Sequence, residues 1–63
     1  MCESEVMIVR KNGNMELFME DVLILKVEGT KIKLFGVLGD SKEIFGRIKE
    51  VNLAEHRVLV EEI

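Results

Sequence analysis

Turn-forming residues divide this chain into short stretches rich in valine, isoleucine and leucine, and this spacing constrains its fold more than any other feature. Candidate turns occur at "KNGN", "EGTK", "LGDSKE" and "NLAEH". Alanine appears once and proline is absent, so the stretches between the turns carry branched side chains, which favour strands. About five or six short strands at such intervals are typical of a small barrel, either SH3-like or of the OB type.

The first two segments read as a hairpin. "EVMIVR" predicts a strand, and Asn12-Gly13 after it offers the positive φ angles of a tight turn. The returning segment "MELFMEDVLILKVEG" is long for one strand, and acidic residues rarely lie in the middle of a strand. We therefore expect a bend or break near Glu20-Asp21, after which "VLILKVEG" forms a strand of its own.

The remaining segments also show strand patterns. In "KIKLFGV" the alternation places Lys31 and Lys33 outward and Ile32 and Leu34 inward. The final third, "EIFGRIKEVNLAEHRVLVEEI", predicts two strands joined by the polar "NLAEH" turn, with a kink or bulge at Gly46.

A helical alternative remains open, because short apolar runs are ambiguous. Two sets of apolar residues also fit helical spacing: Phe18, Val22 and Leu25, and Ile44, Ile48 and Val51. Strands are favoured because no cap and stop signals bracket either segment and the glycines fall at turn-like intervals. The sequence thus predicts a mostly β fold.

Residues 1–63 are expected to form a single small β-barrel domain. A chain this short hides only about 60% of the surface that its unfolded form exposes. Yet 48% of its residues are hydrophobic, which is more than so small a core readily encloses. We expect the surplus to contact a second copy of the chain, in a homodimer.

The charge balance bears on nucleic-acid binding, which draws its affinity mainly from basic residues on phosphates. The net charge is −3, and the nine basic residues do not form a tract. A small-barrel module that binds RNA or another nucleic acid remains the alternative function. Its basic face would consist of Lys31, Lys33, Arg47 and Lys49.

The chain contains a single cysteine, Cys2. One cysteine cannot form an internal disulfide, and this favours a cytoplasmic protein. No stretch resembles a signal peptide, and no apolar run approaches the ~20 residues that span a bilayer. An exposed thiol near a chain end is open to oxidation, so its presence at position two calls for a chemical reason.

Position two offers a chelate that no other position could. The Met1 amine, the Cys2 amide nitrogen and the Cys2 thiolate would close two five-membered rings on a metal. If Met1 is removed, the Cys2 amine becomes the central donor and the Glu3 amide an outer one. Such donors suit square-planar Ni(II) or Cu(II) better than tetrahedral zinc. A two-fold dimer could bring two Cys2 residues together and add the missing donors.

Other residues that could carry chemistry are interpreted as structural. His56 is expected in a solvated turn, and neither a catalytic pair nor a phosphate loop is evident, so we predict that the protein is not an enzyme. Methionines and phenylalanines are expected in the core: Met7, Met15, Met19, Phe18, Phe35 and Phe45. The scattered carboxylates are expected on a solvated surface: Glu3, Glu5, Glu20, Asp21, Asp40 and Glu61-Glu62.

Several of these features together resemble the CooT-type small nickel-binding proteins. The likeness rests on the Met1-Cys2 start, the "EDV" from Glu20, the "GVLGD" from Gly36 and the closing "GRIKEVNLAEHRVLV". The resemblance implies a cytoplasmic homodimer of SH3-like β-barrels that binds nickel through Cys2. For the founding members it implies nickel delivery to carbon monoxide dehydrogenase. The client enzyme of this chain is not indicated by its sequence.

Overall fold

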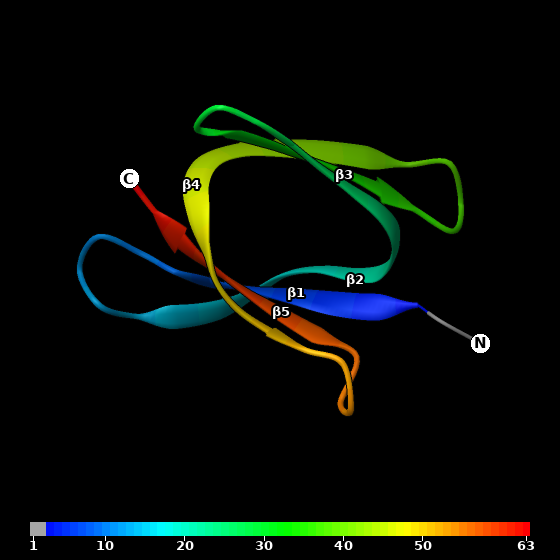
Figure 1. The fold of residues 1–63 in the computed structure, drawn as a ribbon, viewed down its shortest axis with the longest axis horizontal. Coiled ribbons are helices and arrows are strands. Elements are labelled where there is room, and N and C mark those ends of the chain that lie inside the picture. Colours follow the sequence, from blue (N-terminus) through cyan, green and yellow to red (C-terminus); the bar gives the residue numbers. More distant parts are fainter. Residues whose placement is uncertain (1–2) are drawn as a thin grey trace.

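Five strands close into one barrel in the computed structural model, which describes residues 3–63 (Figure 1). The strands are β1 (Ser4–Val9), β2 (Met15–Glu28), β3 (Lys31–Gly36), β4 (Ser41–Asn52) and β5 (Arg57–Glu62). Each is antiparallel to the next along the chain, and β5 closes the ring by lying parallel to β1. The predicted small β-barrel is confirmed.

The hairpin between β1 and β2 is confirmed, but its loop is wider than a two-residue turn. Arg10 N–H donates to the Asn14 carbonyl at 2.8 Å, and Gly13 N–H donates to the Arg10 carbonyl at 2.9 Å. Asn14 N–H also donates to the Asn12 side-chain oxygen. Gly13 has a φ of 91°, whereas Asn12 is not among the residues with positive φ. Only the glycine therefore takes the left-handed conformation.

The expectation that β2 breaks into two strands is wrong. β2 is continuous over 14 residues, and Val22 pairs with both Ser4 of β1 and Gly36 of β3. The predicted bend is present at Asp21, whose φ of 55° is unusual for a residue with a side chain but tolerated by aspartate. Strand pairing continues through the bend, so the single strand β2 pairs first with β1 and then with β3 (Figure 1).

β4 curves in a similar way where it exchanges neighbours. It pairs with β3 as far as Phe45 and with β5 from Gly46 onward. A Cβ atom at Gly46 would lie 2.5 Å from the Glu61 carbonyl oxygen, so the close approach of β5 requires glycine. The expected kink at Gly46 agrees with the curve of β4 in Figure 1, and a register shift follows between Ile48 and Glu50.

The core contains side chains from all five strands. Its buried members are Val6, Ile8, Met19, Val22, Ile32, Leu34, Ile44 and Val60. Ile32 and Leu34 are fully buried, as the alternation in β3 predicts. None of the described residues forms a helix long and apolar enough to span a bilayer.

The prediction that methionines and phenylalanines fill the core is only partly right. Met19 is buried, and Phe18 packs against the core. Met15 is 59% exposed and Phe45 is 58% exposed, so both of these expectations are wrong. Both residues are exposed because the register of their strands turns their side chains to the outer face of the barrel.

Replacing Leu34 by alanine should lower the free energy of unfolding by about 2–5 kcal/mol, because the substitution leaves a cavity in the core. Leu53→Ala is the matched control, since Leu53 is 81% exposed in the turn between β4 and β5. The control should change stability by less than about 0.5 kcal/mol. Urea denaturation followed by circular dichroism measures both, and equal losses would contradict this description of the core.

Candidate functional site

Carboxylates gather at the end of the barrel where β1 begins. Figure 1 shows that this end also contains the bend of β2 and the turn between β3 and β4. Six carboxylates line the two pockets found here: Glu3, Glu5, Glu20, Asp21, Asp40 and Glu55. They come from segments that are far apart in the sequence, so the sequence alone does not predict that they cluster.

The first of these pockets, the N-terminal pocket, has a volume of about 340 Å³. It is lined by Glu3, Ser4, Glu5, Glu20, Asp21, Glu55 and His56. Glu5 N–H donates to the His56 carbonyl at 2.9 Å, which ties β1 to the turn before β5. Arg57 pairs with Glu5 at 2.8 Å. This hydrogen bond, together with Coulombic attraction to Glu5, raises the pKa of Arg57 above its ordinary value.

Glu3 has one carboxyl oxygen, Oε2, that is buried and accepts no hydrogen bond from residues 3–63. A buried carboxylate oxygen without a donor is unfavourable. The residue covalently bonded to Glu3 on its N-terminal side is Cys2. The pocket therefore contains an acceptor without a donor among residues 3–63, on the residue that follows Cys2 in the sequence.

The two residues predicted to bind metal, Met1 and Cys2, lie outside the described residues 3–63. His56 lies in an exposed turn, as expected, although it also lines the N-terminal pocket. Within residues 3–63 no three His, Asp or Glu side chains are grouped so that they could hold a metal ion. A metal site at this end would therefore depend on donors from residues 1 and 2.

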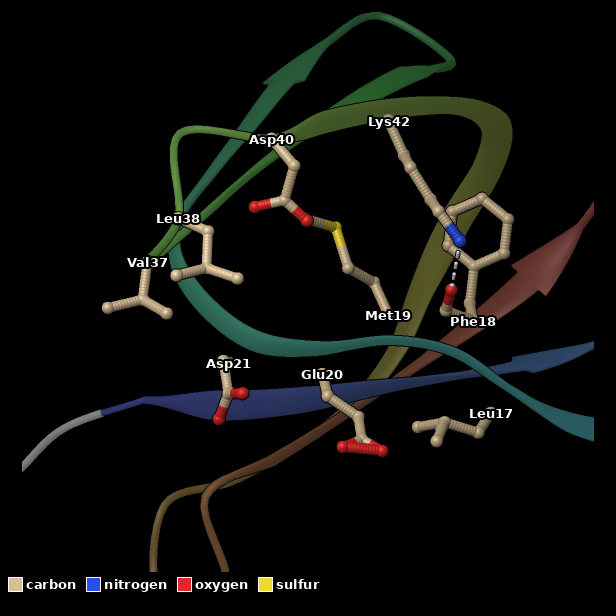
Figure 2. A pocket seen from close by; sticks show the side chains of 9 residues that line it. All are labelled: Leu17, Phe18, Met19, Glu20, Asp21, Val37, Leu38, Asp40 and Lys42. Atoms are coloured by element: carbon tan, nitrogen blue, oxygen red, sulfur yellow. Dashed lines mark hydrogen bonds between the residues drawn. The ribbon is translucent and has the colours of Figure 1, made fainter.

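The second pocket, here named the leucine-rimmed pocket, has a volume of about 330 Å³. Figure 2 shows its lining residues: Leu17, Phe18, Met19, Glu20, Asp21, Val37, Leu38, Asp40 and Lys42. Lys42 Nζ donates to the Phe18 carbonyl at 2.8 Å and lies 4.9 Å from the centroid of the Phe18 ring. The pocket shares Glu20 and Asp21 with the N-terminal pocket, so the two adjoin.

A third feature is the apolar strand face, formed by outward side chains of β1, β5 and the first half of β2. Its members are Met7, Val9, Met15, Leu17 and Leu59. The inward residues of β1, Val6 and Ile8, are buried in the core. From Val6 to Val9, β1 is therefore apolar on both faces, a pattern typical of strands that are covered on both sides.

The basic face of the nucleic-acid alternative is interrupted by acidic residues. Its expected cations are distributed over two strands: Lys31 and Lys33 on β3, and Arg47 and Lys49 on β4. Lys33 pairs with Glu28 at 3.6 Å, and its cross-strand neighbours are Glu43 on β4 and Lys26 on β2. Arg47 lies opposite Glu61. Carboxylates therefore lie among the expected cations on this face.

Comparison with known proteins identifies the family. The model of the family described as CO dehydrogenase accessory protein CooT matches residues 1–61. The chain belongs to the CooT family. The resemblance found in the sequence is thereby confirmed.

A crystal structure assigned to CooT of Carboxydothermus hydrogenoformans shares the fold. It has a TM-score of 0.86 and 34% sequence identity, over 98% of each chain. An uncharacterized protein of Archaeoglobus fulgidus is 44% identical over 68% of this chain and 96% of its own length. Another, MJ1551 of Methanocaldococcus jannaschii, is 42% identical over 76% of this chain and 84% of its own length.

Replacing Glu3 by glutamine should raise the free energy of unfolding of the metal-free protein by about 0.5–1 kcal/mol, because a buried carboxylate oxygen without a donor loses its charge. Glu50→Gln, at an exposed position, should leave stability unchanged. Thermal denaturation in the presence of a chelator measures both. A loss of stability in the Glu3 variant would show that this carboxylate has a partner in solution.

Proposed function

We propose that this CooT-family protein binds Ni(II) through Cys2 and Met1 and delivers it to carbon monoxide dehydrogenase or another nickel enzyme. The observation that carries the proposal is the position of the only cysteine, at residue 2 of a chain whose family is described as a CO dehydrogenase accessory protein. Its role is to bind a metal as a metallochaperone or nickel store, without catalysing a reaction.

The donor atoms at the start of the chain suit this cargo. The Met1 amine, the Cys2 amide nitrogen and the Cys2 thiolate can close two adjacent chelate rings in one plane. Ni(II) accepts such a planar set of nitrogen and sulfur donors, whereas zinc prefers a tetrahedron. Where Met1 is removed, the Cys2 amine takes the central place and the Glu3 amide becomes an outer donor.

The N-terminal pocket supports cation binding near this chelate. Five of its seven lining residues carry carboxylates, and among residues 3–63 only Glu5 and Glu55 of these pair with a cation, Arg57. Clustered charge of one sign raises the local concentration of the opposite ion. Glu3, which follows Cys2 in the sequence, adds an oxygen that has no donor within residues 3–63.

A homodimer would complete the site. Square-planar Ni(II) has four donors, and a two-fold axis through the ion would take two adjacent donors from each copy, the Cys2 thiolate and a neighbouring nitrogen. The apolar strand face supports such a contact, because it leaves apolar side chains on the outside of β1.

Replacing Cys2 by serine should abolish nickel binding, because it removes the thiolate and retains the fold. Anaerobic calorimetric titration with Ni(II) measures the affinity of both proteins, and circular dichroism confirms that their folds agree. Nickel affinity that is unchanged in the serine variant would refute the proposed site.

Replacing Met15 by glutamate should convert the dimer into a monomer, because a charge would be placed in the apolar strand face. Phe45→Glu is the matched control, since Phe45 is almost equally exposed but lies opposite Lys31 on another face. Size-exclusion chromatography with light scattering gives the mass of each variant. If the Met15 variant remains dimeric while the Phe45 variant dissociates, the contact lies on the other face.

Two earlier expectations stay predictions. The cytoplasmic location rests on cysteine usage. Nucleic-acid binding is not advanced as a second function, because the face that would carry it alternates Lys33 and Arg47 with Glu43 and Glu61. A salt series with short RNA would test it, since phosphate contacts weaken steeply with salt.

A further inference from the structure

The leucine-rimmed pocket has firmly connected walls. Val37 N–H donates to the Asp21 carbonyl at 3.0 Å, which joins the turn between β3 and β4 to the bend of β2. Within the turn, Gly36 N–H donates to the Asp40 carbonyl and Gly39 N–H donates to the Gly36 carbonyl. The φ of Gly39 is 83°, which favours glycine there. These bonds hold the two walls in place before any partner binds.

The charges in this pocket are not balanced. Three carboxylates line it, those of Glu20, Asp21 and Asp40. None of the three forms an ion pair with another residue between 3 and 63. Lys42 is the cation of the lining, and its ammonium group is engaged by the carbonyl and the ring of Phe18. The pocket is therefore net negative.

The rim of the pocket is apolar and exposed. Leu38 is 89% exposed at the tip of the turn between β3 and β4, and Val37 and Leu17 are about half exposed. Figure 2 shows Val37 and Leu38 on the turn, the Asp40 side chain pointing toward Met19, and the Glu20 and Asp21 side chains pointing away from Asp40, to the other side of β2. An apolar turn next to a pair of neighbouring carboxylates matches a lysine or arginine side chain, which has an apolar stem and a charged end.

We propose that the leucine-rimmed pocket is a docking site for a partner protein, which places a lysine or arginine side chain against the carboxylates of Glu20 and Asp21 and packs an apolar surface against Leu38. The pocket and its charges stand independently of nickel. Only the identity of the partner, the enzyme that receives the metal, rests on the proposed function.

Charge and symmetry favour a protein other than a second copy of this chain as the occupant. A second copy would have to offer cations such as Lys31 and Lys33 from another face of its barrel. That contact would join two unlike surfaces and would extend into a filament unless it closed into a ring. A nucleic acid is disfavoured because its phosphates would meet carboxylates.

The leucine-rimmed pocket adjoins the N-terminal pocket, so a partner bound there would lie near the proposed metal site. It shares Glu20 and Asp21 with the N-terminal pocket, which Glu3 also lines. A partner held at Leu38 would thus be positioned beside the start of the chain, where nickel binding is proposed. Docking would bring the receiving site close to the residues from which nickel transfer is proposed.

The first test uses the full chain labelled with nitrogen-15 and the probe peptide acetyl-Leu-Arg-Leu-amide. We expect the peptide to shift the backbone amide signals of Asp21, Leu38 and Asp40. The same peptide with citrulline in place of arginine should not, because it lacks the charge. Shifts that map to another face, or equal shifts with both peptides, would overturn the proposal.

The variant for this test is Glu20→Gln/Asp21→Asn, since asparagine also tolerates the positive φ at position 21. We expect at least about fivefold weaker peptide binding, from the loss of two ionic contacts. The matched control, Glu43→Gln/Glu50→Gln, removes the same charge at exposed positions outside this pocket and should bind normally. Equal weakening in both variants would indicate a nonspecific charge effect and contradict the site.

A second test uses metal-free carbon monoxide dehydrogenase immobilised on a sensor surface. Leu38→Ser should weaken its complex with the nickel-loaded protein at least about fivefold, whereas Leu53→Ser, also at an exposed turn, should not. Both variants should bind nickel normally. Normal docking by the Leu38 variant would refute the docking site. If the unmodified protein does not bind nickel, the proposed function is refuted instead.

Discussion

The parallel pairing of β1 with β5 is the contact on which the rest of the structure depends. It joins the first strand to the last and closes the sheet, so no open edge is left between them. It also brings Val6, Ile8 and Val60 together in the core of a chain too short to bury much else. The same pairing places the start of the chain beside the turn before β5, and thereby forms the N-terminal pocket.

Features set by neighbouring residues could be predicted from the sequence, and those set by distant contacts could not. The alternation in β3 predicts the burial of Ile32 and Leu34, because side chains of a strand point to opposite faces. The bend at Asp21 was predictable from its charge, but the continuity of β2 depends on neighbours at both of its ends. Composition alone could not distinguish exposed Met15 from buried Met19, because plain alternation would put both on one face. A register shift between Leu17 and Met19 instead turns Met19 into the core. At the candidate site, the thiol at position two could be read from the sequence. The clustering of carboxylates could not, because it depends on closure of the barrel.

Metal binding and partner recognition are proposed at two different places in the molecule. The proposed chelate uses donors from residues 1 and 2. The proposed docking site uses a turn and a bend that the barrel holds in place through the bond between Val37 and Asp21. Separate sites suit transfer, because the metal must leave while the partner stays bound.

Native mass spectrometry and absorption spectroscopy of the anaerobic protein loaded with Ni(II) test most directly whether two chains share one nickel ion. We expect two chains carrying one nickel ion, with a thiolate-to-nickel charge-transfer band that disappears when the metal is removed and is absent from the Cys2→Ser protein. One nickel ion on each single chain, or a nickel-loaded dimer without this band, would contradict a site shared between two copies of Cys2.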